Sequence, residues 1–402
     1  MKNLSLSPEI QLLLCYSRTE IDEKVAKRAE DILEQPLNWD YLLKTAYNHG
    51  VAPLLYNNLK KTKSKDIIPK DTIKSLEAIY YATAFNNMQL LKETGKVLNA
   101  FNDARIKAII FKGSSLSKII YKNPALRPFS DVDVLISKDD LPKVIDILTN
   151  MGYVLPEYLL PFGLYTKYHF HLLFIKKNGH QTNLEIHWDL KDNFKYSPMG
   201  IMEIWRDARQ VEISGAPAMI MAPEDLLIYL CHHLDRHGYM NRFIYNQQNC
   251  YSFILNELSG NRLIWFVDIY EVIKYYGKRI NGANLIEKTR NWDKDGSVAS
   301  TLFFTNWLFQ AELDPDVLSA LKSPGSSIIE GLLYGFIIKR YYQKGQKDYI
   351  LKFLDKKILK MDERFQFRPI RLIELNYRLI TLFVLFPFEL AYHIIKRFIS
   401  KY

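Results

Sequence analysis

Asp131 and Asp133 are the residues whose type and spacing best suit catalytic chemistry. They alternate with Val132 and Val134 in an apolar run that is typical of a central β-strand. Side chains two positions apart on a strand point to the same face, and two neighbouring carboxylates usually need a cation to hold them together. We therefore predict that this strand presents both aspartates to a divalent metal, as phosphoryl-transfer chemistry requires.

A glycine-serine turn, Gly113 and Ser114, precedes the two aspartates. Gly113 is the last residue of the apolar run IKAIIFKG. Glycine lets the backbone approach phosphate oxygens, while the serine hydroxyl and the first N–H groups of the following helix can donate hydrogen bonds to them. Lys112 and Arg127 are candidate cations for a triphosphate or its leaving pyrophosphate. Surface exposure or a structural ion pair is the alternative interpretation for each of these two cations.

A third carboxylate is expected on the later strand NLEIHWDL, where polar and apolar residues alternate. Glu185, His187 and Asp189 share one face of this strand. If the strand neighbours the one that carries the aspartates, three carboxylates can hold two Mg²⁺ ions about 4 Å apart. Glu185 is the preferred third ligand and Asp189 the competing one. His187 is better suited to orienting a neighbour than to catalysis.

Helical and strand patterns alternate along the chain, and they must position these side chains. Helical periodicity covers residues 8–103, with breaks at Pro53 and Pro69 and one or two long helices over 72–103. Helical patterns return from residue 223 onward. The expected elements between them are a strand at 106–113, a helix at 114–121, a strand at 129–137, a helix at 139–152, a hairpin joined by Asn178 and Gly179, and a strand pair at 209–221 that bends at Gly215 and Pro217.

This order predicts an α+β fold in which a mixed sheet core is flanked by N- and C-terminal helical regions. The expected regions are an N-terminal helical region at 1–104, the core at 105–221, a helical substrate or cap region at 222–322, and a C-terminal helical region at 323–402. Basic residues among Phe, Leu and Ile at 371–402 suit weak contact with an anionic membrane surface, although a core helix is the preferred interpretation.

The combined motifs resemble a known family. Gly113, Ser114, Asp131, Asp133 and Glu185 together resemble the signature of the polymerase-β-like nucleotidyltransferase superfamily. More narrowly, residues 40–290 resemble an uncharacterised bacterial nucleotidyltransferase family through a Lys-Gly turn, Arg-Pro-x-Ser-Asp-x-Asp, EIHW, CHHLDRHG and NRLIWFVD. The resemblance implies the superfamily's mixed-sheet fold, an NTP substrate and metal ligation by the three carboxylates. Sixteen residues separate Ser114 from Asp131, a gap longer than is usual in the superfamily.

Composition favours a folded protein with an anionic partner. Hydrophobic residues make up 48% of the 402 residues, charged residues 24%, and the formal net charge is +10. Nucleic-acid binding is the least favoured use of this charge, because the sequence holds no recognised binding module. Three widely spaced cysteines and the lack of a secretory signal predict a cytoplasmic protein, with membrane-peripheral contact as an alternative.

These observations predict a Mg²⁺-dependent nucleotidyltransferase, with Mn²⁺ as an alternative ion. It would transfer a nucleoside monophosphate from an NTP such as ATP to a hydroxyl or phosphate of a small-molecule, glycan or protein acceptor, and release pyrophosphate. The alternative is a noncatalytic nucleotide- or anion-binding scaffold that recruits a partner or a membrane surface. His233 and His237, four residues apart on an expected helix, fit a core or cleft position better than a zinc site.

Overall fold

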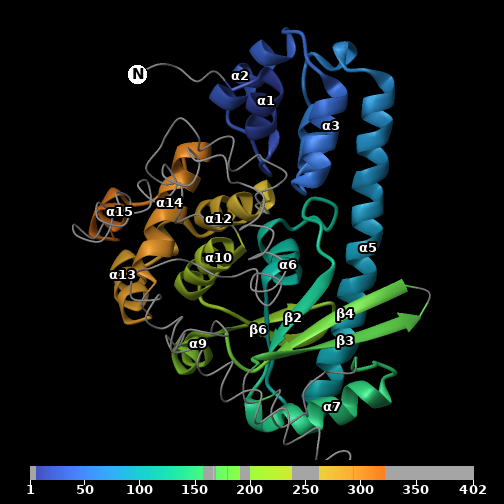
Figure 1. Ribbon diagram of the computed structural model, residues 1–402, viewed down its shortest axis with the longest axis vertical. Helices are drawn as coiled ribbons and strands as arrows, with labels where there is room; N and C mark the ends of the chain where they lie inside the picture. Colours follow the sequence, from blue (N-terminus) through green and yellow to red (C-terminus); the bar gives the residue numbers. More distant parts are fainter. Residues whose placement is uncertain are drawn as a thin grey trace, which may run out of the picture. The chain divides into compact units, whose positions relative to one another are not determined.

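The computed structural model describes residues 6–156, 166, 169–178, 180–190, 200–237, 262–292 and 294–321. N-terminal helices, a mixed sheet and a second group of helices follow one another along the chain (Figure 1). This arrangement confirms the predicted mixed-sheet fold with flanking helices. The predicted C-terminal region at 323–402, including 371–402, lies outside the described residues. Within the described ranges, every helix is too short or too polar to span a bilayer.

From residue 6 onward, five α-helices and a 3₁₀ turn at Lys65–Ile67 precede the sheet. The α-helices are α1 (Pro8–Tyr16), α2 (Glu23–Leu33), α3 (Trp39–Asn48), α4 (Ala52–Leu59) and α5 (Lys70–Asp103). Pro53 lies in the first turn of α4, where its missing N–H has no helical partner to lose. Pro69 immediately precedes α5. The periodic stretch predicted as one or two helices is a single helix of 34 residues, which passes along the sheet (Figure 1).

The described strands form a six-stranded sheet in the order β3-β4-β2-β1-β6-β5. Their bounds are β1 (Ile109–Phe111), β2 (Asp131–Leu135), β3 (His171–Asn178), β4 (His180–His187), β5 (Arg209–Ile213) and β6 (Ala216–Ile220). Strand β2 is antiparallel to β1 and parallel to β4, while β1 is parallel to β6. The two strands predicted to carry the carboxylates, β2 and β4, are therefore neighbours within the sheet.

The segment between β1 and β2 is less regular than the predicted helix at 114–121. A short helix, α6 (Lys112–Ser115), continues into a π-helical stretch at Leu116–Ile120. After β2, α7 (Leu141–Asn150) follows a 3₁₀ turn at Lys138–Asp140 and ends before Gly152, whose φ is +84°. That left-handed conformation carries little steric penalty for glycine, as expected for a residue just beyond a helix end.

The turn between β5 and β6 differs from the prediction at one residue. Ser214 and Gly215 form the bend, with φ angles of +51° and +81°. Two-residue hairpin turns favour such left-handed pairs, because their twist matches that of the flanking strands. Pro217, predicted at the bend, lies instead within β6 opposite Glu212.

The two faces of the sheet are covered by different helices. Helix α5 packs on one face, where Phe101 and Leu98 lie in the same buried cluster as Val132 and Val134 of β2. On the other face, Phe111 and Leu135 belong to a second buried cluster. That cluster includes α10 (Pro223–His237) and α12 (Leu263–Tyr276). The remaining helices in the described part of the chain are α9 (Ile201–Asp207), a 3₁₀ turn at Gly277–Arg279, α13 (Gly282–Asn291), α14 (Asp295–Phe309) and α15 (Pro315–Leu321).

Helix α5 offers a matched test of the core. Phe101→Ala removes a side chain with 0% exposure from the buried cluster between α5 and β2. It should therefore lower the free energy of unfolding by about 3–5 kcal/mol. Phe85→Ala on the same helix, where the ring is 56% exposed, should change it by less than about 1 kcal/mol. Urea unfolding of both variants measures the difference. Equal losses would contradict the assignment of Phe101 to the core.

Candidate active site

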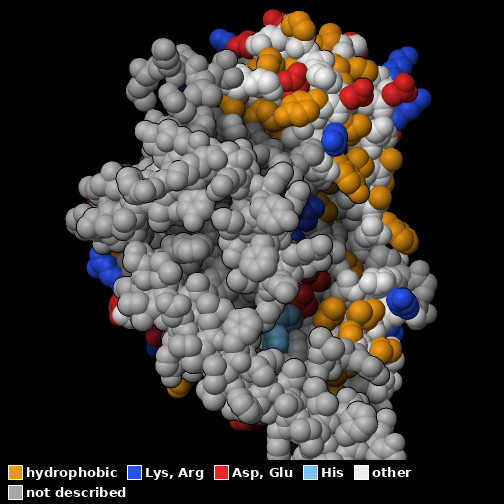
Figure 2. Space-filling model, viewed as in Figure 1, with side chains coloured by type: hydrophobic (Ala, Val, Ile, Leu, Met, Phe, Trp, Pro, Cys, Tyr) orange, Lys and Arg blue, Asp and Glu red, His pale blue; other side chains and the backbone are white. Residues whose placement is uncertain are grey.

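The register between β2 and β4 brings two predicted carboxylates side by side. Asp133 lies directly opposite Glu185, and Leu135 lies opposite His187. The His187 Nε2 atom is 3.0 Å from Asp133 Oδ1 and 3.3 Å from Glu185 Oε2. Among the described residues, Asp133, Glu185 and His187 form the one group of three potential metal ligands whose atoms all lie within 4.8 Å of one another. Acidic and histidine side chains also lie next to each other on the face shown in Figure 2.

Asp131 lies near this group without belonging to it. It begins β2 opposite Asn183 and is half-buried, whereas Asp133 is 1% exposed. Burial, and then the negative charges of Asp133 and Glu185, raise the pKa of Asp131 to about 6. Three carboxylates thus concentrate negative charge at one end of the paired strands, and a bound cation would relieve their repulsion.

Lys112 already neutralises part of this charge. Its Nζ atom is 2.6 Å from Asp133 Oδ1, and its backbone has a φ of +56°. Burial opposes ionisation of Asp133, but Lys112 and then His187 outweigh it and hold the pKa of Asp133 well below its usual range. A left-handed conformation at a lysine is strained, and such strain often accompanies functional sites. The sequence left a phosphate contact and an ion pair open for Lys112, and the structure places it in an ion pair.

The predicted phosphate turn begins at Gly113, where a larger residue would not fit. A Cβ atom there would collide with the Arg127 guanidinium and lie 2.6 Å from the Phe129 Cβ. The next side chain, Ser114, is fully buried, and its Oγ has no hydrogen-bond partner among the described residues. A buried hydroxyl without a partner is unusual, so a ligand oxygen would complete its bonding.

Arg127 reaches the turn from a buried ion pair. Its Nε and Nη2 atoms donate to the two carboxylate oxygens of Asp268 on α12, at 3.2 and 2.7 Å, and the Tyr121 hydroxyl donates to Asp268 at 2.8 Å. Asp268 is 1% exposed and Arg127 8% exposed. Although burial opposes its charge, Asp268 raises the pKa of Arg127. The role of Arg127 as a phosphate contact stays a prediction, and the structure adds its attachment to α12.

Sequence reasoning missed Asp268. A signal was present, because an acidic residue inside the apolar pattern LIWFVDIYEVI must be paired if the helix is buried. The partner could not be identified, since Asp268 follows Arg127 by 141 positions in the sequence.

The remaining predicted histidines lie on two elements. His233, on α10, lies against Tyr229 and Trp265, with ring centroids 6.1 and 5.5 Å apart. His237 ends α10, and its side chain is outside what the structure describes. His171, which the sequence did not single out, lies on β3 with its ring 5.0 Å from that of His187. Burial and then His187 lower the pKa of His171 to about 4, so its imidazole is neutral at pH 7.

Residues 35–310 match a family described as "Uncharacterised nucleotidyltransferase". The chain belongs to this family. Membership confirms the family predicted from the motifs and makes the protein an enzyme of the nucleotidyltransferase class. No curated protein matches the chain.

Solved structures similar to this nucleotidyltransferase are distant. An antigenic nucleotidyltransferase-like protein from Paracoccidioides brasiliensis is 17% identical, with 58% of this chain and 93% of that chain covered and a TM-score of 0.35. The antibiotic-resistance factor ANT(2'')-Ia is 14% identical, with 48% and 96% covered and a TM-score of 0.28. Its complex with adenylyl-2''-tobramycin gives 14% identity, 46% and 98% coverage and a TM-score of 0.27.

The Arg127–Asp268 pair gives a stability prediction. Asp268→Asn leaves a buried guanidinium without its counter-charge, so it should lower the free energy of unfolding by about 3–5 kcal/mol. The double variant Arg127→Met/Asp268→Asn removes the unpaired charge and should recover at least half of that loss. Denaturant unfolding measures both variants. A single variant as stable as the native chain would show that the pair is not needed for folding.

Proposed function

We propose that this protein transfers a nucleoside monophosphate from a Mg²⁺-bound NTP to a hydroxyl or phosphate of an acceptor and releases pyrophosphate. The observation that supports this most is the register of β2 and β4, which sets Asp133 beside Glu185 and His187 in a member of a nucleotidyltransferase family. The turn at Gly113 and Ser114, whose buried hydroxyl has no described partner, adds a donor group for phosphate.

The donor set fits a divalent cation. Asp131, Asp133 and Glu185 would hold the metal, and carboxylate oxygens are the ligands that Mg²⁺ and Mn²⁺ prefer. Three carboxylates against the single ammonium of Lys112 leave two negative charges when His187 is neutral. Mg²⁺ bound there would polarise the transferred phosphoryl group and favour ionisation of the acceptor hydroxyl.

The protein's own groups have separate roles in this proposal. Ser114 Oγ and the N–H groups of the turn donate to phosphate oxygens, and the Arg127 guanidinium lies against the same turn. The acceptor oxygen forms a bond to the α-phosphorus, and the bond between that phosphorus and the bridging oxygen breaks. The electron pair of the broken bond leaves with pyrophosphate. Glu185 accepts the acceptor's proton, while His187 holds Asp133 in place by a hydrogen bond and lies 3.3 Å from the Glu185 carboxylate.

One observation favours the noncatalytic alternative. The Lys112 ammonium lies 2.6 Å from Asp133, beside the oxygens that would ligate a metal, so it could serve there as a fixed cation in a nucleotide- or anion-binding scaffold. The catalytic proposal gives Lys112 a different use, because a flexible lysine can turn from a carboxylate to an arriving phosphate. The two functions make opposite predictions for removal of this charge.

Several finer properties stay predictions: a small-molecule, glycan or protein acceptor, a cytoplasmic location, membrane contact through 371–402, and the four-region division of the chain.

Carboxylate removal tests the catalytic proposal. Asp131→Ala, Asp133→Ala and Glu185→Ala should each lower Mg²⁺-dependent pyrophosphate release from labelled NTP by about a thousandfold, equivalent to about 4 kcal/mol of barrier. Asp189→Ala, at the competing position on the strand continuation, should retain activity within about threefold. The assay uses the four NTPs with a metabolite extract as the acceptor source. Full activity in Glu185→Ala with loss in Asp189→Ala would reassign the third carboxylate.

Removal of the lysine charge separates the two functions. If the protein is a catalyst, Lys112→Met should weaken NTP binding or turnover about tenfold to hundredfold, because a charge-assisted contact to phosphate is lost. Mn²⁺ titration followed by electron paramagnetic resonance, with parallel nucleotide binding, measures the effect, and circular dichroism confirms folding. Tighter Mn²⁺ binding with unchanged nucleotide binding would favour the scaffold.

A further inference from the structure

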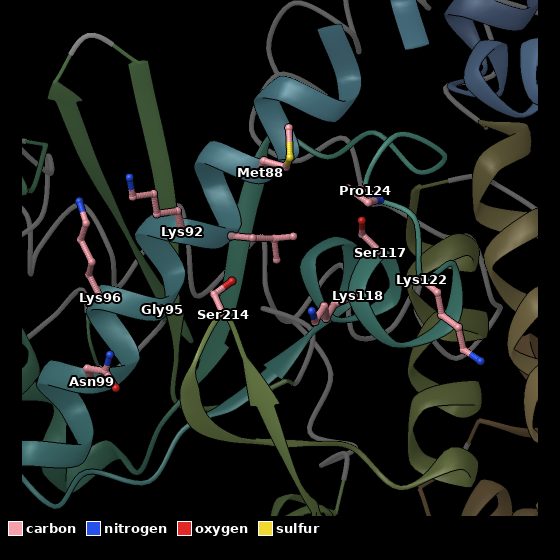
Figure 3. A pocket seen from close by; sticks show the side chains of 11 residues that line it. Met88, Lys92, Gly95, Lys96, Asn99, Ser117, Lys118, Lys122, Pro124 and Ser214 are labelled. Atoms are coloured by element: carbon pink, nitrogen blue, oxygen red, sulfur yellow. The ribbon is translucent and has the colours of Figure 1, made fainter. Parts of the chain in front are cut away.

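We propose a second anion-binding site, separate from the carboxylates, for a phosphate monoester. A cavity of about 460 Å³ is lined by one face of α5, by residues 117–124 and by the turn between β5 and β6 (Figure 3). Helix α5 packs on the face of the sheet opposite to the one that carries Asp133 and Glu185. Four of the eleven lining residues are lysines, and none is acidic.

Ser117 supplies the observation that points to a ligand. Its side chain lines the cavity, is 1% exposed, and has an Oγ atom without a hydrogen-bond partner among the described residues. Buried hydroxyls are nearly always bonded, so a polar ligand atom in the cavity would supply the missing partner. Ser117 belongs to the π-helical stretch Leu116–Ile120, and single π turns occur frequently at functional sites.

The charges around the cavity define the ligand class. Within the described part of the chain, Lys92 and Lys118 form no ion pair with a carboxylate, whereas Lys96 pairs with Glu93 at 2.8 Å. The Lys122 ammonium lies over the Tyr275 ring at 5.2 Å. The lysines give the cavity a positive charge, which suits the negative charge of a phosphate monoester near pH 7.

The shape of the cavity allows more than a free phosphate ion. Its volume is in the range of small-molecule sites, and Met88 and Leu91 give it an apolar wall on α5. Gly95 lets the β5–β6 turn close the cavity, because a Cβ there would lie 2.8 Å from the Ser214 carbonyl oxygen. The phosphate would contact Ser117 and Lys118, while the organic group of the ester would lie along the apolar wall toward Lys92.

The continuous helical segment at residues 112–120 connects this cavity to the predicted phosphate turn. Gly113 and Ser114 lie near the start of this segment, and Ser117 and Lys118 follow within four residues of Ser114. A ligand in the cavity would therefore contact the segment that positions the turn. The binding site itself does not depend on the proposed function, since it shares no residue with the carboxylate group.

Pyridoxal 5′-phosphate is a suitable probe, because it is a phosphate monoester whose aldehyde forms an imine with a nearby lysine. Borohydride reduces the imine to a stable amine, and peptide mass spectrometry identifies the modified residue. In the full chain with EDTA, Lys92 and Lys118 should react first. Inorganic phosphate at ten times its dissociation constant should slow their labelling about tenfold, whereas sodium chloride of equal ionic strength should not.

Variants and controls make the outcome decisive. Ser117→Ala should weaken protection by inorganic phosphate about tenfold, because one charge-assisted hydrogen bond is lost. Lys74→Gln, an exposed α5 position outside the cavity, should leave protection unchanged. If Ser117→Ala does not fold, the labelling map of the native chain decides alone. Uniform labelling of surface lysines, protection by chloride, or protection confined to Lys112 would each overturn the proposal.

Discussion

Neutralisation of the Asp133 charge is the interaction on which the candidate active site depends. Its carboxylate is almost fully buried at the centre of the sheet, where an uncompensated charge would strongly destabilise the fold. Lys112 and His187 compensate it through the same oxygen, Oδ1. Lys112 does so from a left-handed backbone conformation at the end of β1. The strained backbone at Lys112 and the buried Asp133 carboxylate are thus parts of one arrangement. Gly113, the first residue of the predicted phosphate turn, comes immediately after Lys112 in the sequence.

A second buried ion pair extends this arrangement to the helices that follow the sheet. Asp268 holds Arg127 against Gly113, so helix α12 is attached to the turn through charge as well as through packing. Tyr121, which follows the π-helical stretch, donates to the same carboxylate. The run from β1 to Tyr121 is therefore fixed at both ends, at Asp133 through Lys112 and at Asp268 through Tyr121. Between these two points, the buried hydroxyls of Ser114 and Ser117 have no hydrogen-bond partner among the described residues, whereas Ser115 Oγ donates to the Lys112 carbonyl oxygen.

Local patterns predicted the elements and faces of the core well. Alternation in NLEIHWDL correctly set Glu185 and His187 on one face, because side-chain direction in a strand depends only on parity. Parity does not give the register between strands, so the different positions of Asp131 and Asp133 relative to Glu185 could not be predicted. Pro217 was misplaced because a proline near a glycine indicates a turn without showing where the turn ends, and the two-residue turn at Ser214 and Gly215 leaves Pro217 within β6. Asp268 required a contact between distant segments, which no local pattern contains.

The hydrogen bonds of Asp133 also restrict how a ligand can approach. His187 Nε2 lies 3.0 Å from Asp133 Oδ1 and 3.3 Å from Glu185 Oε2, so a proton on Nε2 suits both carboxylates. Oδ1 then receives both Lys112 and His187, while Oδ2 receives no hydrogen bond from any described residue. The oxygen left for a cation is therefore Oδ2, together with the half-buried carboxylates of Asp131 and Glu185. The two oxygens of Asp133 thus have different roles. Oδ1 forms the buried ion pair that stabilises the strand, and Oδ2 remains for chemistry. One aspartate can therefore serve both the fold and the site.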